Sequence, residues 1–260
     1  MNYGLYLSAS GMLASTYRQD VATNNLANMN TVAFKVDVPT VRQRDAVRIE
    51  DGLAAMPSNE LLERLGGGVQ LAPNHIDFSQ GDLTSSRNPL DLAIDGPGFF
   101  VMSQGTSGAR ESLVLSRDGR MTLSADGRLV SATSGMSVLS TSNQPIRLSP
   151  SEGPVMISGD GVVKQDGMEI ARLRVADIAD RSVLKKIGES IFEANASTVE
   201  NLFQTDATVR QGFTEASGVN EIAAINAIRA ASGAASTNAE MIRNHDRLMD
   251  MAISRLGRVA

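Results

Sequence analysis

Apolar residues recur at alternating steps of three and four through residues 221–258. This spacing predicts one long helix with a seam of the kind found in coiled coils. The positions of the expected seam are Ile225, Ile228, Ser232, Ala235, Ala239, Ile242, Asp246, Met249, Ile253 and Leu256. Because a seam of this length at a chain end has little to bury it locally, the helix needs a partner.

Residues 2–27 predict a second helix with a weaker seam. The positions of this seam are Leu5, Ala9, Met12, Thr16, Gln19, Thr23 and Leu26. A helix with small and polar seam residues is marginal alone and needs neighbours. The other terminus of the chain, a neighbouring subunit, or both can supply them. The helix is expected to end within the asparagine-rich residues 24–28, because asparagine competes with helical hydrogen bonding and tolerates the left-handed conformation.

From Val69 to Phe192 the pattern is different, because short runs in which apolar and polar residues alternate are separated by glycine. Asp-Gly pairs at 118–119 and 126–127 predict two successive hairpins, and hence a three-stranded meander, because glycine accepts the positive φ of a hairpin turn. Two more Asp-Gly pairs, beginning at Asp160 and Asp166, predict further hairpins. The spaced carboxylates and closing glutamate of a calcium loop are missing, so the pairs are interpreted as turns.

These patterns predict an α+β fold. Long N- and C-terminal helices pair as a coiled coil, and the domain inserted between them is mainly β, hairpin-rich and barrel- or sandwich-like. The expected ranges are 1–30 for the N-terminal helix, 31–75 for an extended connector with a short helix at 59–65, 76–192 for the central β domain, 193–220 for an extended return segment, and 221–260 for the C-terminal helix.

Composition excludes several classes of function. The 260 residues carry a net charge of −5 without a basic stripe, which argues against nucleic acid as a partner. No stretch approaches the ~20 apolar residues of a membrane span, so insertion into a lipid membrane is not expected. The first ten residues lack the basic start and apolar run of a cleavable signal peptide.

Candidate chemistry is equally sparse. The two histidines, His75 and His245, lie too far apart to suggest a metal site, and the chain has no cysteine to complete a ligand set. We interpret His75 as a turn or strand residue and His245 as part of a solvated helix face. The sequence contains no Gly-x-Ser-x-Gly turn and no phosphate-binding loop. We therefore expect no catalytic, cofactor or metal site, and no enzyme activity.

One central segment, residues 88–100, is far from generic. Asn88-Pro89 predicts an extended or turn start, since proline disfavours helix in the preceding residue. Apolar and other residues then alternate, which predicts a strand with one apolar face. The apolar positions are Leu90, Leu92 and Ile94, and those between them are Asp91, Ala93 and Asp95. A turn at Gly96-Pro97-Gly98 leads into the next strand, in which Phe99 and Phe100 are expected in the core.

This segment strongly resembles the central motif of bacterial flagellar rod and hook proteins. Other stretches resemble the same family in the family's order: residues 24–28 with Thr31 and Phe34-Lys35, residues 78–83, residues 116–120 with 125–130, and residues 211–220. The residues that we assign to the family motif are Asn24, Asn25, Leu26, Ala27, Asn28, Asn88, Pro89, Leu90, Asp91, Ala93, Ile94, Gly96, Gly98, Phe99 and Phe100.

The resemblance implies a structural subunit of the flagellar basal-body rod, with the proximal member favoured over the distal one. Such a subunit would polymerise through its terminal helices into the axial shaft that transmits torque. Its partners would be copies of itself, other rod and hook axial proteins, and the flagellar export apparatus. It would reside in the periplasmic rod without a cleavable signal. The alternatives are a secreted β-domain binding module with a dimerising coiled coil, or a hook-type axial subunit.

The chain departs from the family pattern at three positions. Ala33 replaces the usual glycine before Phe34, which predicts that a backbone requirement there is relaxed. Gly218 replaces the usual asparagine, and no aromatic residue follows Arg229, which leaves a smaller side chain at a packing position. The connector at 45–68 lacks the longer stretch usual in the distal protein, which favours the proximal member.

Overall fold

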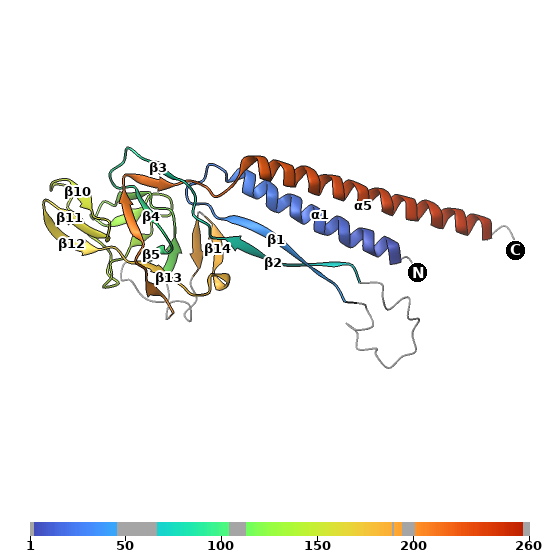
Figure 1. Ribbon diagram of the computed structural model, residues 1–260, viewed down its shortest axis with the longest axis horizontal. Coiled ribbons are helices and arrows are strands. Elements are labelled where there is room, and N and C mark those ends of the chain that lie inside the picture. Colours follow the sequence, from blue (N-terminus) through green and yellow to red (C-terminus); the bar gives the residue numbers. More distant parts are fainter. Residues whose placement is uncertain (1–2, 46–66, 104–112, 189, 194–200, 257–260) are drawn as a thin grey trace. The chain divides into compact units, whose positions relative to one another are not determined.

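The computed structural model describes residues 3–45, 67–103, 113–188, 190–193 and 201–256 (Figure 1). The chain divides into two compact units. Unit 1 comprises Met1–Ala27, Asp37–Asp77 and Asn220–Ala260, and unit 2 comprises Asn28–Val36 and Phe78–Val219. The two ends of the chain thus belong to one unit, and all of unit 2 lies between them in the sequence.

Unit 1 contains the two terminal helices, which run side by side in opposite directions (Figure 1). Helix α1 spans Tyr3–Ala27 and α5 spans Glu221–Leu256, so the expected pairing of the termini is confirmed. Helix α1 ends inside the predicted asparagine-rich stretch. Helix α5 begins at a favourable cap, because the Asn220 Oδ1 accepts a hydrogen bond of 3.0 Å from the backbone N–H of Ala223.

A two-stranded sheet completes unit 1. Its strands are β1 (Val36–Gln43) and β2 (Val69–Asp77), and β2 contacts α1. Strand β1 falls within the expected connector, residues 31–75, and β2 begins within it and ends two residues beyond it. His75 lies on β2 as an exposed strand residue. The short helix expected at residues 59–65 lies outside the described residues.

Unit 2 is built from antiparallel strands. Its largest sheet has the order β14-β15-β6-β5-β9-β8-β7, and β13 joins it by pairing with β5 and with β16. The strands of this sheet are β5 (Phe99–Ser103), β6 (Leu113–Ser116), β7 (Met121–Leu123), β8 (Leu129–Ser131), β9 (Ser137–Val138), β13 (Val175–Asp177), β14 (Lys185–Gly188), β15 (Ile191–Glu193) and β16 (Phe203–Gln204).

Three smaller sheets complete unit 2. The strands β10 (Val155–Ile157), β11 (Val162–Gln165) and β12 (Met168–Arg172) form a three-stranded sheet. The late strands β17 (Thr208–Gln211) and β18 (Phe213–Glu215) pair with the early strands β4 (Leu92–Asp95) and β3 (Leu83–Ser85), respectively. A short 3-10 helix, η2 (Arg181–Val183), precedes β14. The domain ranges expected from the sequence remain predictions.

Three of the four Asp-Gly pairs form the expected hairpins. They connect β7 to β8, β10 to β11 and β11 to β12, and the glycines Gly127, Gly161 and Gly167 have φ angles of 75°, 79° and 81°. The hairpin expected at Asp118-Gly119 is wrong, because β6 pairs with β5 and β15 instead of β7. Glycine is needed at position 119 because the backbone of Leu92 passes close to it: a Cβ atom on residue 119 would lie 1.7 Å from the Leu92 carbonyl oxygen.

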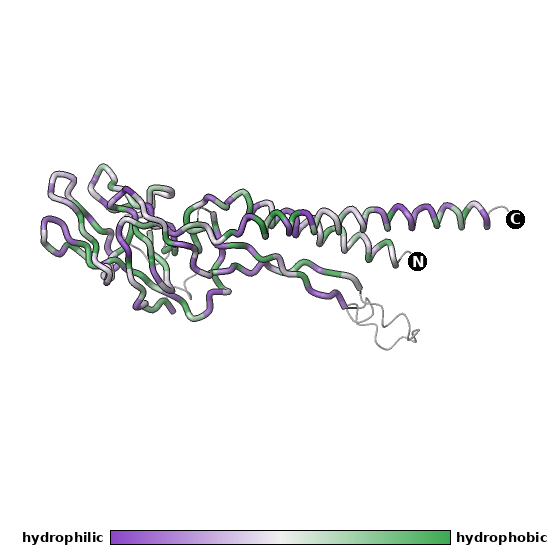
Figure 2. Tube along the Cα trace, turned by 45° about the horizontal axis from the view of Figure 1, so that its top comes forward, coloured by the Kyte–Doolittle hydropathy of each residue, from purple (hydrophilic) through white to green (hydrophobic). Residues whose placement is uncertain are grey.

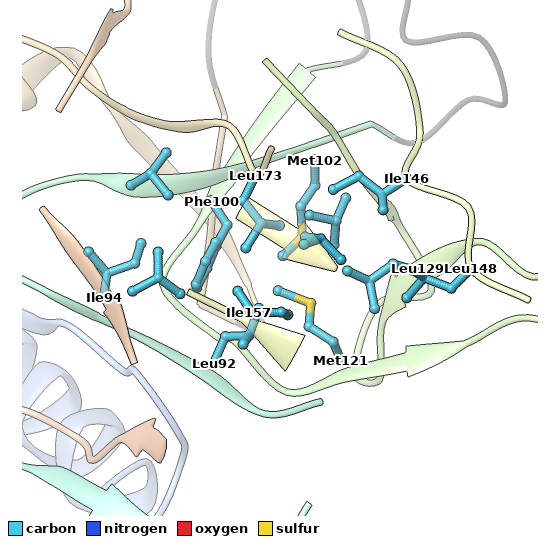
Figure 3. Packing of buried hydrophobic residues seen from close by; sticks show 14 of the residues in the cluster. Leu92, Ile94, Phe100, Met102, Met121, Leu129, Ile146, Leu148, Ile157 and Leu173 are labelled. Atoms are coloured by element: carbon cyan, nitrogen blue, oxygen red, sulfur yellow. The ribbon is translucent and has the colours of Figure 1, made fainter. Parts of the chain in front are cut away.

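A hydrophobic cluster in the core of unit 2 consists of aliphatic residues, methionines and Phe100 (Figure 3). The central motif contributes Leu92, Ile94 and Phe100, which are each no more than 1% exposed. In Figure 3, Leu92 lies beside Ile157, on the side of the cluster that includes Met121. Phe99 is 2% exposed and its ring packs edge-on to Phe78, so the expectation that both phenylalanines belong to the core is confirmed.

Candidate assembly surfaces

Most of the fully buried residues on the two helices of unit 1 have small side chains. Those buried on α1 include Ser8, Ala14, Ser15, Val21 and Ala22, and those buried on α5 are Ala224 and Ala231. Small residues let helix backbones approach closely, but each one buries little apolar area. Pairing within one chain therefore gains less from burial than a seam of leucine and isoleucine would.

The structure places the positions of the expected α5 seam in two groups. Ile225, Ile228, Ala235, Ala239 and Ile242 are half-buried, whereas Ser232, Asp246, Met249 and Ile253 are exposed. On α1, Leu5, Ala9 and Leu26 are half-buried and Met12 is 37% exposed. The side chain of Leu256 lies outside the described residues.

A second heptad row on α5 completes the surface that faces α1. This row is Ala224, Ala231, Asn238 and His245. The two polar members meet glycines of α1: a Cβ atom on Gly11 would lie 3.1 Å from the Asn238 amide, and one on Gly4 would lie 2.6 Å from the His245 imidazole. Each glycine thus leaves room for one polar side chain.

The position of His245 corrects the expectation of a solvated helix face. The side chain is half-buried and its ring packs against Gly4 of the other helix. The sequence held a signal for this contact, because Gly4 and Gly11 are seven residues apart, as are Asn238 and His245. Two rows of equal spacing can face each other along an antiparallel pair.

Asn25, one of the family-motif residues, fixes the start of β1 against the end of α1. Its side-chain amide donates to the Asp37 carbonyl oxygen at 2.8 Å and accepts from the Asp37 N–H at 3.0 Å. The buried amide therefore replaces the backbone partner that a neighbouring strand would supply. The phenol of Tyr17 donates to Asn74 of β2 at 2.6 Å, which attaches the second strand to α1.

Unit 2 buries a cluster of three charged side chains. Lys35 and Glu215 are each 1% exposed, and the Lys35 Nζ lies 2.5 Å from the Glu215 Oε1. The Arg117 Nε lies 3.2 Å from the Glu215 Oε2, and the guanidinium of Arg117 donates twice to the Gly96 carbonyl oxygen at 2.9 Å. We call these three residues the charge cluster.

The charge cluster contains two cations and one carboxylate. Burial lowers the pKa of Arg117, and the carboxylate of Glu215 opposes this shift. The Glu215 Oε1 also accepts a hydrogen bond from the Gly81 N–H at 3.0 Å, while Oε2 accepts none from the described residues and is held by its ion pair with Arg117. Glu215 is consequently the one anion that compensates both cations within the cluster.

The charge cluster joins segments that looked independent in the sequence. Lys35 comes from the N-terminal signature, Gly81 from residues 78–83, Arg117 from residues 116–120 and Glu215 from residues 211–220. Nothing in the spacing of these segments predicted that they meet. Charged residues were visible in each motif, but nothing in the sequence indicated that they share one site.

Ala33 retains the backbone conformation that the glycine of the family motif permits. Its φ is 56°, in the left-handed region, and its side chain is 0% exposed. The expectation that the requirement is relaxed at this position is therefore wrong. The Ala33 N–H donates to the Glu215 carbonyl oxygen at 2.8 Å, and the Gly218 N–H donates to the Phe34 carbonyl oxygen at 3.0 Å. These bonds hold the alanine in a conformation that costs a non-glycine residue energy.

The central motif has a structural role as well. The Asn88 side chain donates to Asp91 at 2.8 Å and accepts from the Leu90 N–H at 3.1 Å, which closes the turn around Pro89. The following strand was expected to have a single apolar face. Instead both of its faces are covered, since Leu92, Ala93 and Ile94 of β4 are all buried. Gly96 and Gly98, with φ of 112° and 128°, then reverse the chain.

Neither a metal cluster nor a membrane helix occurs in the described part of the chain. The described residues contain no group of three or more histidine, aspartate or glutamate side chains arranged to hold a metal ion. Across the same residues, neither long helix is apolar enough over a sufficient length to cross a membrane. The notable features are a pair of helices with exposed apolar residues and a β unit closed by buried ion pairs, which define a structural subunit.

Comparisons with known proteins identify the family. The model of the family "Flagella basal body rod protein" matches residues 5–35. The chain is 31% identical over 259 residues to the flagellar basal-body rod protein FlgF of Caulobacter vibrioides, covering 100% of both chains. It is 28% identical over 265 residues to FlgG of the same organism, covering 94% of this chain and 96% of that one. The FlgF of Mesorhizobium japonicum is 26% identical over 257 residues, covering 99% of each.

This chain belongs to the flagellar basal-body rod protein family, whose members are structural rather than enzymatic. The pairing of the terminal helices agrees with this assignment. Both the FlgF and FlgG branches of the family are represented among the relatives.

Proposed function

We propose that this rod subunit polymerises through α1 and α5 with copies of itself and with other axial proteins of the rod and hook. The resulting shaft transmits torque. The observation that carries this proposal is the division of the expected α5 seam: Ile228, Ala235 and Ile242 are half-buried, while Met249 and Ile253 stay exposed. A helix whose apolar residues exceed what its own partner covers has surface left for a neighbouring subunit.

The subunit resides in the periplasmic rod, and we place it in the proximal part. Support for this placement comes from the connector at 45–68, which lacks the longer stretch usual in the distal protein. Export uses the flagellar export apparatus. A chain without cysteine suits this route, because it forms no disulfide on arrival in an oxidising compartment.

Mass spectrometry of purified hook–basal bodies tests the proposal. We expect the chain in intact particles, and in preparations of the rod that lack the hook. Recovery of the protein only in soluble or cell-surface fractions would contradict it. Limited proteolysis of the purified monomer gives a second readout: α1 and α5 should be cleaved early and unit 2 should resist, since the helices lack their neighbours before assembly.

A further inference from the structure

The glycine contacts between the two helices define the register of the pair. Gly11 faces Asn238 and Gly4 faces His245, so a step of seven residues along α1 corresponds to a step of seven in the opposite direction along α5. Helix α1 begins at Tyr3, immediately beyond the second contact. The part of α5 after His245 therefore has no described α1 residue beside it.

We call this part, residues 246–256, the α5 overhang. At about 1.5 Å per residue it is roughly 16 Å long. Figure 1 shows α5 continuing beyond the N-terminal end of α1. As a continuation of α5 it needs no new helix nucleus, but its large apolar residues stay exposed.

The α5 overhang exposes four large apolar side chains, and two charged residues, Asp246 and Arg255, lie one heptad from Ile253 and Leu248. Leu248, Met249, Met251 and Ile253 are 59%, 41%, 42% and 65% exposed.

Met249 also continues a heptad row that faces α1 in the body of the pair. The earlier members of this row, Ile228, Ala235 and Ile242, are half-buried, whereas Met249 is exposed. The surface that packs against α1 thus extends into the α5 overhang, where no described part of α1 covers it.

Helix α1 presents a complementary surface on the side away from α5. Tyr6 and Leu13, seven residues apart, are 70% and 68% exposed, and we call them the outer ridge. No charged residue occurs between Tyr3 and Tyr17. In Figure 2 this part of α1 is mostly white to green, whereas the end of α5 alternates purple with green. A helix without charge on its outer side is typical of a helix that is covered on all sides.

We propose that the α5 overhang of one copy packs along the outer ridge of α1 in the next copy of this chain. This inference rests on the proposed function and names the contact by which neighbouring copies join. The two surfaces differ, so the contact is heterologous: every copy offers one overhang and one ridge, and the series stays open when the rotation between copies does not close a ring. The charged side of the overhang, with Arg247 and Asp250, remains in solvent.

Cysteine cross-linking tests this contact directly, because the chain has no cysteine of its own. Two full-length alleles with different tags are co-expressed in a strain without the native gene, one with Leu13→Cys and the other with Ile253→Cys. After mild oxidation of purified hook–basal bodies we expect a disulfide-linked dimer that carries both tags. The matched control replaces Ile253→Cys with Arg247→Cys, on the charged side of the overhang, and should give several-fold less dimer.

Incorporation of both alleles without a mixed dimer above the control would overturn the proposed contact and leave the proposed function intact. Dimers formed by Ile253→Cys alone would also overturn it, because they indicate an overhang-to-overhang contact. If Ile253→Cys is not incorporated, Met249→Cys on the same side takes its place. Absence of the unsubstituted tagged chain from the particles would instead contradict the proposed function.

Discussion

Lys35 and Glu215 form an ion pair across 180 residues of sequence, with 2.5 Å between the Nζ and the Oε1. Because Glu215 also pairs with Arg117, the carboxylate compensates two buried cations. Removing it takes the shared carboxylate away from two buried cations. Removing Lys35 leaves an intact pair behind.

Glu215→Ala should therefore destabilise unit 2 more than Lys35→Met does. We expect a loss of about 3–5 kcal/mol for Glu215→Ala, the range for removing one partner of a buried ion pair. Urea unfolding of the purified chain measures both variants. Asp160→Ala is the control, since its ion pair with Arg172 is exposed and should contribute little to stability. Equal and small effects of all three substitutions would contradict the role of the charge cluster.

Substitutions of Ala33 should separate backbone strain from packing. Ala33→Val is expected to lower the free energy of unfolding by about 2 kcal/mol or more, because a β-branched residue is poorly tolerated at positive φ and the site has no free space. Ala33→Gly should change it by less than about 1 kcal/mol, since relief of strain is opposed by the greater freedom of glycine in the unfolded chain. A stabilising Ala33→Val would show that the left-handed conformation is absent in solution.

The glycines of the helices should differ in their tolerance of a side chain. Gly4→Ala is expected to weaken helix pairing and rod incorporation, because its Cβ atom would collide with His245. Gly233→Ala is the matched control: a Cβ atom there meets nothing within 4 Å, so the substitution should stabilise α5 by about 0.5–1 kcal/mol. Far-ultraviolet circular dichroism and quantification in basal bodies measure the two effects. Equal tolerance of both would exclude a role of Gly4 in the register.

Charge placed on the surface of α5 that faces α1 should stop assembly. Ala235→Arg or Ala239→Arg is expected to abolish incorporation into the rod while unit 2 remains folded, since both positions are half-buried beside α1. Arg247→Ala, at an exposed position, should be nearly silent. Motility and basal-body composition report assembly, and protease resistance of unit 2 reports folding. An intact rod that contains either arginine variant would refute this prediction.

Asp126, in the turn between β7 and β8, should have a pKa below its usual value. Hydrogen bonds from Ser124 and Arg128 lower the pKa of Asp126 from 3.8 to about 2. Because the folded-state pKa is the lower one, the stabilisation is present above pH 3.8 and is lost as the pH falls through about 2. Carboxyl titration by NMR measures this shift. Ser124→Ala should move the pKa back towards its usual value, and an unchanged titration would contradict the assigned cause.

Local patterns predicted the elements whose causes are local. The heptad spacing predicted both long helices, and three of the four Asp-Gly pairs predicted their hairpins. The failures came from tertiary contacts. Gly119 is required by the nearby Leu92 carbonyl oxygen rather than by a turn, and His245 is half-buried because Gly4 stands opposite. Likewise, single charged residues in separate motifs gave no indication that Lys35, Arg117 and Glu215 share one site.

The pairing of late strands with early ones has a consequence for the order of folding. Strand β18 pairs with β3 and β17 with β4, and Thr214 lies 130 residues after its neighbour Thr84. Contacts between such distant residues form slowly, since a long loop must close first. A chain that emerges N-terminus first therefore cannot complete unit 2 until its last strands are present. The strand topology by itself therefore delays the folding of unit 2 until nearly the whole chain has emerged.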